Sequence, residues 1–474
     1  MEDLSLTRRL EEYSRSGAIP FHMPGHQRRS LHSPTLPWAL DITEIDGFDD
    51  LHDPEGVLAE SMDRAARLWG AQGSRYLVNG SSGGILAALH AALPRGSCVL
   101  VARNCHKSVY HALELLDLTS VFLQPPPDPA FGVAGSLTPA AVAAALDVHP
   151  GVRALVFPSP TYDGVLSDVA GLCRLCHSRG IAVLVDEAHG AHLGFSPFPS
   201  GAVAAGADVV IQSLHKTLPS LTQTAILHRQ GRLVDPDRLA RSLGIFQTSS
   251  PSYPLMASMD GCVRLLEREK GTLFPAWANH LADFDEKIKA LRRLRVLCHG
   301  GDRAEDHPAF FGYDPSKLVI STRGTGLTGP ALMERLRRDF GLELEMAAAD
   351  YVTAMTGLGV TGERLEALAA ALLAVDAGLS LAPAAPVPAA PALPRRVLSA
   401  GEALERPAEV LPLDRAAGQT AAEYLWAYPP GIPLLVPGEE VGTDFAALCA
   451  RYESAGIRLK HTGGTAPEQI RVCR

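Results

Sequence analysis

Residues 181–218 read IAVLVDEAHGAHLGFSPFPSGAVAAGADVVIQSLHKTL and contain two short apolar runs, each followed directly by ionisable residues. The runs, 181–185 and 208–212, have the length and β-branched content of buried strands. Asp186 comes directly after the first run, and Lys216 lies shortly after the second. The interval between them matches about one strand–helix–strand unit, so we expect both residues on adjacent or near-adjacent strands.

Five further runs of the same kind extend the pattern on both sides of this stretch, and most are separated by segments capable of forming a helix. They are residues 75–79, 98–102, 120–124, 153–157 and 224–228. Strands alternating with helices predict an α/β fold with a mostly parallel, seven-stranded, doubly wound sheet. Such sheets bind ligands beyond the carboxyl ends of their strands, which makes the residues after each run the candidates for function.

The rest of the chain divides by composition. We expect an irregular N-terminal arm over 1–59, a large α/β domain over 60–300, and a small α+β region over 301–378. An Ala/Pro-rich linker, 379–396, should be stiff and extended, and a C-terminal module follows over 397–474.

The composition excludes several classes of protein. Of the 474 residues, 46% are hydrophobic and 20% charged, which is typical of a globular chain with a large core. The net charge of −9 does not favour nucleic-acid binding, and no apolar run is long enough for a membrane span. Eight cysteines are too few for a disulfide scaffold, and the polar N-terminus lacks the core of an export signal. We therefore expect a cytoplasmic enzyme with reduced thiols.

Four strand ends carry residues that chemistry could use, although each has an ordinary structural alternative. Gly80-Ser81-Ser82-Gly83-Gly84 opens a helix and could bind a phosphate, or could be a simple Ser N-cap. His106 could be catalytic or a buried structural histidine. Asp186 could meet a cation or cap a helix, and Lys216 could be reactive or a solvated loop residue.

Together these four features are more specific than any one of them. Pyridoxal phosphate needs an anion cradle, a flat partner for its ring, a carboxylate for its pyridine nitrogen and a lysine amine for its aldehyde. The strand ends offer one residue type for each requirement. The pattern therefore predicts a site for this cofactor.

The chain resembles the Orn/Lys/Arg decarboxylase family of fold-type-I pyridoxal-phosphate enzymes, and in length it resembles the compact members. The stretches that carry the resemblance are FHMPGH, TEIDGFDDLHDPEG, LVNGSSGG, RNCHKS, SPTYDGV, VDEAHGAHLGF, SLHKTLPSLTQTA, QTSSPSYPLMASMD and YPPGIPLLVPGE. They run from residue 21 to 439, nearly the whole chain.

The resemblance implies a role for individual residues. Lys216 would be the Schiff-base lysine, Asp186 would pair with the pyridine nitrogen, and His106 would stack on the ring. Ala188 would pack beneath the ring, and Thr161 would meet the phenolic oxygen. The remaining cofactor contacts would be to phosphate, with Ser81 and Ser82 as the main cradle and Ser213 and His215 assisting. Glu423 would accept the distal cation of the substrate.

The resemblance also implies an activity: decarboxylation of a basic amino acid to an amine and CO₂, with arginine favoured over lysine or ornithine. The alternatives are another reaction of the same cofactor, such as aminotransfer, or a non-catalytic regulator on the same scaffold. Fold-type-I enzymes usually place the site at a subunit interface, which implies a homodimer or larger homo-oligomer. The N-terminal segment with its Pro24-Gly25-His26 turn would cross to the partner.

Two other signals carry less weight. Cys173-Arg174-Leu175-Cys176-His177 matches a haem-attachment pattern, but it lies in a helix-like segment without an export signal. We expect two buried thiols there. His189 and His192 are not accompanied by a full ligand set, so no metal is expected, although one of them could line the active site.

Overall fold

The computed structural model describes residues 5–16, 23, 24, 27, 35–383, 392–428, 432–454 and 457–474. Most of the FHMPGH motif, the middle of the Ala/Pro-rich linker and residues 429–431 of YPPGIP lie outside the described residues. The predicted crossing of the N-terminal turn to a partner therefore stays a prediction.

All seven predicted strands form one sheet, in the order β1-β8-β7-β6-β4-β2-β3. The strands are β1 (Gly73–Leu77), β2 (Cys98–Ala102), β3 (Thr119–Leu123), β4 (Val152–Pro158), β6 (Ala182–Asp186), β7 (Val209–Gln212) and β8 (Ala225–Arg229). β8 runs antiparallel to both neighbours, and the other pairs are parallel. The predicted mostly parallel sheet is confirmed.

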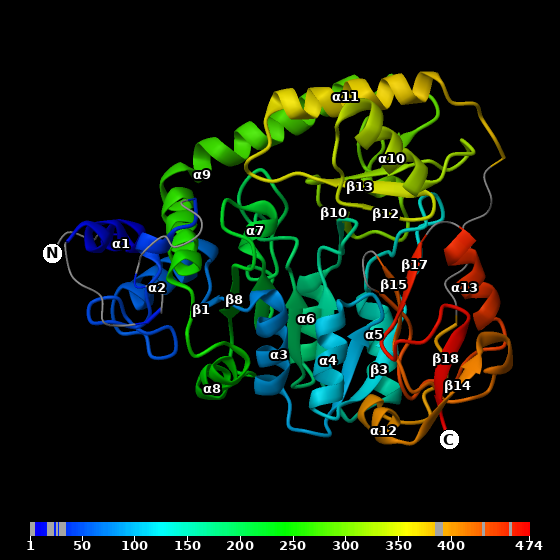
Figure 1. Cartoon of the computed structure of the whole chain (residues 1–474), viewed down its shortest axis with the longest axis horizontal. Coiled ribbons are helices and arrows are strands. Elements are labelled where there is room, and N and C mark those ends of the chain that lie inside the picture. Colours follow the sequence, from blue (N-terminus) through cyan, green and yellow to red (C-terminus); the bar gives the residue numbers. More distant parts are fainter. Residues whose placement is uncertain are drawn as a thin grey trace.

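Helices cover this sheet (Figure 1). They are α3 (Gly80–Ala92), α4 (Lys107–Leu115), α5 (Pro139–Val148), α6 (Val169–His177) and α8 (Pro236–Phe246), with α8 packed against α3. At Gly84 a Cβ would lie 2.4 Å from Leu77 Cδ1, so α3 approaches the sheet more closely than a side chain would allow. The two cysteines of the haem-like pattern are buried in α6, as predicted.

The N-terminal helices lie against the first part of a long helix, α9 (Tyr253–Ile288) (Figure 1). These helices are α1 (Leu6–Arg15) and α2 (Val57–Trp69). Gly70 caps α2 with a φ of 74°, a left-handed conformation that favours glycine. The Asp260 carboxylate of α9 accepts hydrogen bonds from Leu6 N and Ser61 Oγ, which ties both helices to it.

The far end of α9 leads into a smaller, four-stranded antiparallel sheet. Its order is β12 (Met346–Ala347), β13 (Tyr351–Met355), β11 (Lys317–Ser321) and β9 (Arg295–Val296), with α10 (Gly329–Phe340) and α11 (Gly362–Ala377) beside it. A two-stranded ladder of β5 (Val165–Leu166) and β10 (Gly312–Tyr313) joins it to the large domain. Strand β9 of the small sheet lies before residue 301, where the small region was expected to begin. The domain limits given above remain a prediction.

The C-terminal module has its own core and is held against the large domain by a buried ion pair. Its elements are α12 (Ala400–Glu405), β14 (Ala408–Pro412), β15 (Leu425–Tyr428), β16 (Ile432–Leu435), α13 (Phe445–Ser454), β17 (Arg458–His461) and β18 (Gln469–Cys473). Arg103, just past β2, donates two hydrogen bonds to Glu439, at 2.6 and 2.9 Å. Among the described residues, no helix is both long and apolar enough to cross a membrane.

Candidate active site

Two neighbouring parallel strands end at the same edge of the large sheet and place Asp186 and Lys216 in one site. Asp186 is the last residue of β6 and pairs in register with Ile211 of β7. β7 is followed at once by α7 (Leu214–Thr217), a single turn that carries Lys216. Burial lowers the pKa of Lys216, and the negative charge of Asp186 offsets part of that shift.

Asp186 is a buried carboxylate with few protein partners. Among the described residues, its one hydrogen bond comes from Ala188 N to Oδ1, at 3.2 Å. Burial raises the pKa of Asp186, although the positive charge of Lys216 acts in the opposite direction. A buried acid in this state gains from any ligand that brings a cation or an N–H to it.

The amine of Lys216 contacts a histidine from the loop after β6. Lys216 Nζ lies 2.8 Å from His189 Nε2. Burial and the neighbouring cations Lys216 and Lys317 lower the pKa of His189 well below its usual value, so the ring is neutral. His189 packs on the Tyr162 ring at 4.8 Å, and the Tyr162 hydroxyl donates to Glu345 at 2.6 Å. This chain of contacts leads from the lysine to an exposed carboxylate of the small domain.

A buried ion network holds the loop after β6 in place. Asp314 bonds His192 Nε2 at 2.9 Å and Lys317 Nζ at 3.3 Å, with all three side chains buried. Burial acts to raise the pKa of Asp314, but His192 and Lys317 hold it well below its usual range. Lys317 also donates to the backbone oxygen of His189, at 3.3 Å. The two histidines therefore have different surroundings, one facing Lys216 and one in the ion network.

The predicted anion cradle lies at the first turn of α3. Gly80 has a φ of 69° and begins the helix, which places Ser81 and Ser82 in its first turn. Helix α3 packs against β7, since a Cβ on Gly84 would lie 3.2 Å from Ile211 Cγ2. Ser213 follows β7 directly and is buried. Hydroxyls and free backbone N–H groups at a helix start are suited to a phosphate.

Two histidines flank the same edge. His106 is the N-cap of α4, where its Nδ1 accepts from Ser108 N at 3.3 Å. Partial burial and the charge of Lys216 lower the pKa of His106 to about 4, so its imidazole is neutral and available for ring stacking. His215 Nδ1 is bonded to the carbonyl oxygen of Thr224 at 2.8 Å, which fixes the orientation of that ring.

Several buried polar atoms around this edge have no hydrogen-bond partner among the described residues. They are Ser213 Oγ, Thr217 Oγ1, His189 Nδ1 and Asn104 Oδ1. Such groups cost free energy unless a ligand satisfies them. Hydroxyls for a phosphate, an under-bonded carboxylate and a lysine amine fit the donor set that pyridoxal phosphate requires.

A cavity of about 510 Å³ opens beside Lys216, between α7 and the small domain. Its walls include the loop 357–360 and the charged side chains of Glu343 and Arg364. At Gly357 a Cβ would lie 3.0 Å from the carbonyl oxygen of Thr217, so this loop passes close to α7. The lysine thus has space for a small molecule on its small-domain side.

The structure places the two remaining predicted residues differently. Thr161 is buried in the loop after β4, where its Oγ1 accepts from Val165 N at 3.1 Å. Glu423 lies in the C-terminal module, and its carboxylate accepts from Gly463 N at 2.8 Å, Thr465 Oγ1 at 2.8 Å and Arg471 N at 2.7 Å. Both Glu423 oxygens thus accept hydrogen bonds from its own module, and its contact with a substrate cation stays a prediction.

Three residues of the site were not expected from the sequence. Tyr162 and Lys317 contact His189, and Glu345 accepts a hydrogen bond from Tyr162, so these contacts join segments far apart in the chain. Tyr162 does lie in the SPTYDGV stretch, beside the expected Thr161, but no local pattern points to Glu345.

Comparison with known proteins decides the family. Residues 5–297 match the model of the Orn/Lys/Arg decarboxylase major domain, and residues 389–455 match the model of its C-terminal domain. The chain belongs to the Orn/Lys/Arg decarboxylase family. The "Arginine decarboxylase" of Halalkalibacterium halodurans is 33% identical over 460 residues, covering 94% of this chain and 93% of the relative. The "Arginine decarboxylase" of Bacillus subtilis is 30% identical over 479 residues, covering 98% and 96%.

Comparison with solved structures supports the fold. The Francisella novicida lysine decarboxylase LdcF aligns with a TM-score of 0.82 at 18% identity, covering 99% of this chain and 81% of that one. The ureidoglycine–glyoxylate aminotransferase of Bacillus subtilis aligns over 69% of this chain with a TM-score of 0.54 at 16% identity. The predicted α/β architecture with a smaller C-terminal portion is confirmed.

Proposed function

We propose that this member of the Orn/Lys/Arg decarboxylase family uses pyridoxal phosphate to decarboxylate a basic amino acid, with arginine as the favoured substrate. The observation that carries the proposal is the convergence of Lys216, Asp186 and His189 at the ends of β6 and β7. The names of the relatives at 30% and 33% identity support arginine over lysine and ornithine.

The predicted cofactor contacts fit this edge of the sheet. Lys216 would attach the cofactor through its amine, and the Asp186 carboxylate would face the pyridine nitrogen, with Ala188 beneath the ring and His106 stacked on it. Thr161 Oγ1 accepts a hydrogen bond within its own loop, and its hydroxyl hydrogen would donate to the phenolic oxygen. The phosphate would be bound by the hydroxyl and imidazole groups of Ser81, Ser82, Ser213 and His215.

When bound, pyridoxal phosphate supplies a sink for the electron pair left by the departing carboxylate. Asp186 would hold a negative charge at the pyridine nitrogen, and its burial would make that charge effective because water does not screen it. Neutral His189, at 2.8 Å from Lys216 Nζ, would orient the lysine amine through this contact. Burial, which lowers the pKa of Lys216, favours the free amine that would react.

Glu345 is a second carboxylate, besides Glu423, that would suit the distal cation of the substrate. It is exposed, it is oriented by the hydroxyl of Tyr162, and its charge acts to raise the pKa of Lys216. A guanidinium group can form two parallel hydrogen bonds with a carboxylate, whereas an ammonium group cannot. This geometry is the physical basis for favouring arginine.

The test is incubation of the purified, cofactor-loaded protein with arginine, lysine and ornithine in turn, scoring amine and CO₂. Release of agmatine and CO₂ from arginine at the highest kcat/KM supports the proposal. A keto acid product would indicate aminotransfer, and the absence of turnover with all three would favour a non-catalytic regulator. Light scattering of the same sample tests the proposed homodimer.

A further inference from the structure

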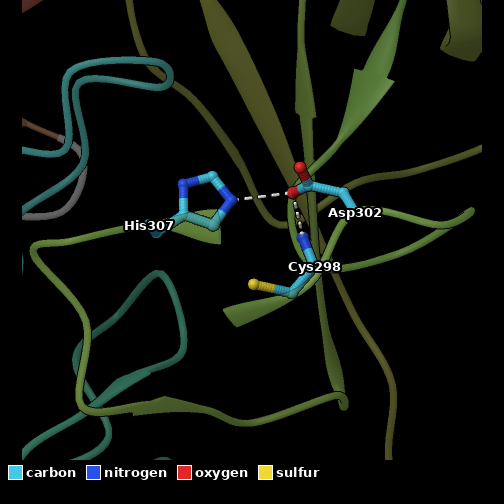
Figure 2. Close-up of side chains that lie close together, drawn as sticks. All are labelled: Cys298, Asp302 and His307. Atoms are coloured by element: carbon cyan, nitrogen blue, oxygen red, sulfur yellow. Dashed lines mark hydrogen bonds and ion pairs between the residues drawn. The ribbon is translucent and has the colours of Figure 1, made fainter. Parts of the chain in front are cut away.

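The loop between β9 and β10 gathers a cysteine, an aspartate and a histidine. Cys298 lies just after β9 in a left-handed conformation, with a φ of 55°. Gly300 and Gly301, with φ of 64° and 106°, turn the chain back on itself. As a result, Cys298, Asp302 and His307 face one another across the loop (Figure 2).

These three side chains offer ligand atoms that all lie within 4.8 Å of one another. Asp302 Oδ2 accepts from Cys298 N at 2.8 Å and lies 2.8 Å from His307 Nε2. A thiolate sulfur, an imidazole nitrogen and a carboxylate oxygen are the three donor types that Zn²⁺ takes in proteins. The side chains of Cys298 and Asp302 are partly exposed, so an ion can reach them from solvent.

A fourth residue orients the histidine as a metal ligand requires. Asp128 Oδ2 accepts from His307 Nδ1 at 2.9 Å, and the two side chains are 0% and 2% exposed. Asp128 is fixed in turn, because its Oδ1 accepts from Ala130 N at 3.0 Å and from Phe131 N at 2.7 Å. A carboxylate behind one ring nitrogen directs the other nitrogen to the metal, which is a common arrangement around zinc.

We propose that Cys298, Asp302 and His307 form a binding site for a divalent transition metal, with zinc as the best fit, and that Asp128 positions His307 within it. On binding, the Cys298 thiol and the Nε2 position of His307 each release a proton to solvent. Asp302 rotates, since nitrogen and oxygen ligands of one tetrahedral zinc lie roughly 3.3 Å apart. One thiolate and one carboxylate balance the charge of Zn²⁺, and water completes the four ligands.

The site would link two loops of the chain. It joins the loop 298–307 to the loop that contains Asp128, two segments that meet between the large domain and the small sheet. They also meet at Gly135, where a Cβ would lie 2.6 Å from the carbonyl oxygen of Ala309. A metal at this point would hold the two loops together. The same stretch of chain leads on to Asp314 and Lys317, which contact the active-site loop.

The experiment uses the full-length, cofactor-loaded protein, stripped with a chelator, dialysed against zinc and then against metal-free buffer. Zinc per chain is measured by mass spectrometry, and zinc-edge X-ray absorption identifies the ligands. We expect one zinc per chain with one sulfur neighbour at about 2.3 Å. Cys298→Ser should lose the sulfur signal and bind zinc at least about tenfold more weakly, because loss of a residue that only supports a ligand already weakens binding by that much.

Two further variants make the result decisive. Cys98→Ser removes another partly exposed thiol and should leave both signals unchanged. His307→Gln should abolish zinc binding, but it also breaks the bonds to Asp128 and Asp302, so Cys298→Ser is the main test if that variant does not fold. Wild-type protein should melt at a higher temperature with zinc than without it, and Cys298→Ser should not. No stoichiometric zinc, or zinc without a sulfur neighbour, would overturn the proposal.

Discussion

Asp186 and Glu423 are both buried carboxylates, but the protein surrounds them in opposite ways. Asp186 receives one hydrogen bond from the described residues, and burial raises its pKa. Glu423 receives three at 2.7–2.8 Å, lies near His461, and has a lowered pKa despite burial. A saturated carboxylate stabilises the fold around it, whereas an under-bonded one costs stability and stays available for a ligand.

This contrast distinguishes residues that do chemistry from residues that hold the structure. Asp186 lies beside an amine with a lowered pKa and several unsatisfied polar atoms. Glu423 lies in a closed set of bonds within one module. Each prediction below tests one side of this comparison.

Lys216→Ala should produce the largest effect, because it removes the amine to which Asp186 and His189 are directed. We expect kcat/KM to fall by at least about 10³-fold, in the range seen for loss of an attacking residue. The visible absorption band of the bound cofactor and its loss on borohydride treatment should both disappear. Lys289→Ala, at an exposed lysine on the surface, is the control and should retain both.

Asp186→Asn should lower kcat by roughly 10²–10³-fold, since it removes a buried charge that acts on the reacting system. The variant should still bind the cofactor, because the phosphate contacts and Lys216 remain. In the cofactor-free protein it should be at least as stable as wild type at neutral pH, since an ionised acid with a raised pKa opposes folding. Loss of both activity and stability would remove the contrast with Glu423.

The large sheet and its edge were predictable because both depend on local sequence. Strands of a mostly parallel sheet are short, largely apolar runs, and the seven strands of the sheet lie at the seven runs seen in the sequence. A parallel sheet then fixes where each run ends, which brings Asp186, Ser213 and Lys216 to one edge without knowledge of packing.

The partners supplied by other modules were not predictable in this way. Tyr162 meets Glu345 only because the small sheet packs over the large domain, and no pattern within either segment indicates it. Glu423 stands near a motif of the resemblance, but only the packing of residues 461–471 around it reveals that its oxygens are occupied. Contacts between modules depend on docking, which a single sequence does not specify.

Glu423→Gln separates its two possible roles. If Glu423 bound the substrate cation, KM would rise; from its bonds in the structure, we expect KM and kcat to stay near wild type. Unfolding free energy should instead fall by about 2–3 kcal/mol, because an amide cannot accept all the bonds of the carboxylate. Glu409→Gln, at a half-exposed carboxylate of the same module, is the control and should change stability by less than about 0.5 kcal/mol.

The pH dependence of these stabilities is the smallest expected effect and the sharpest test of the comparison. The pKa of Glu423 in the folded chain lies below its usual 4.5, so its stabilising effect is complete above pH 4.5 and is lost as the pH falls through the folded value. The loss of unfolding free energy in Glu423→Gln relative to wild type should therefore shrink on acidification below pH 4.5.

Asp186 has the opposite sign, because its pKa is raised above 3.8. The free energy that its charge costs the folded state is complete above the folded pKa and disappears as the pH falls toward 3.8. In urea titrations of the cofactor-free proteins, the stability difference of Asp186→Asn should shrink as the pH falls toward 3.8. The difference of Glu423→Gln should stay constant down to pH 4.5 and shrink, from the opposite side of zero, only below it. Two differences of the same sign would show that the two carboxylates are not held in opposite ways.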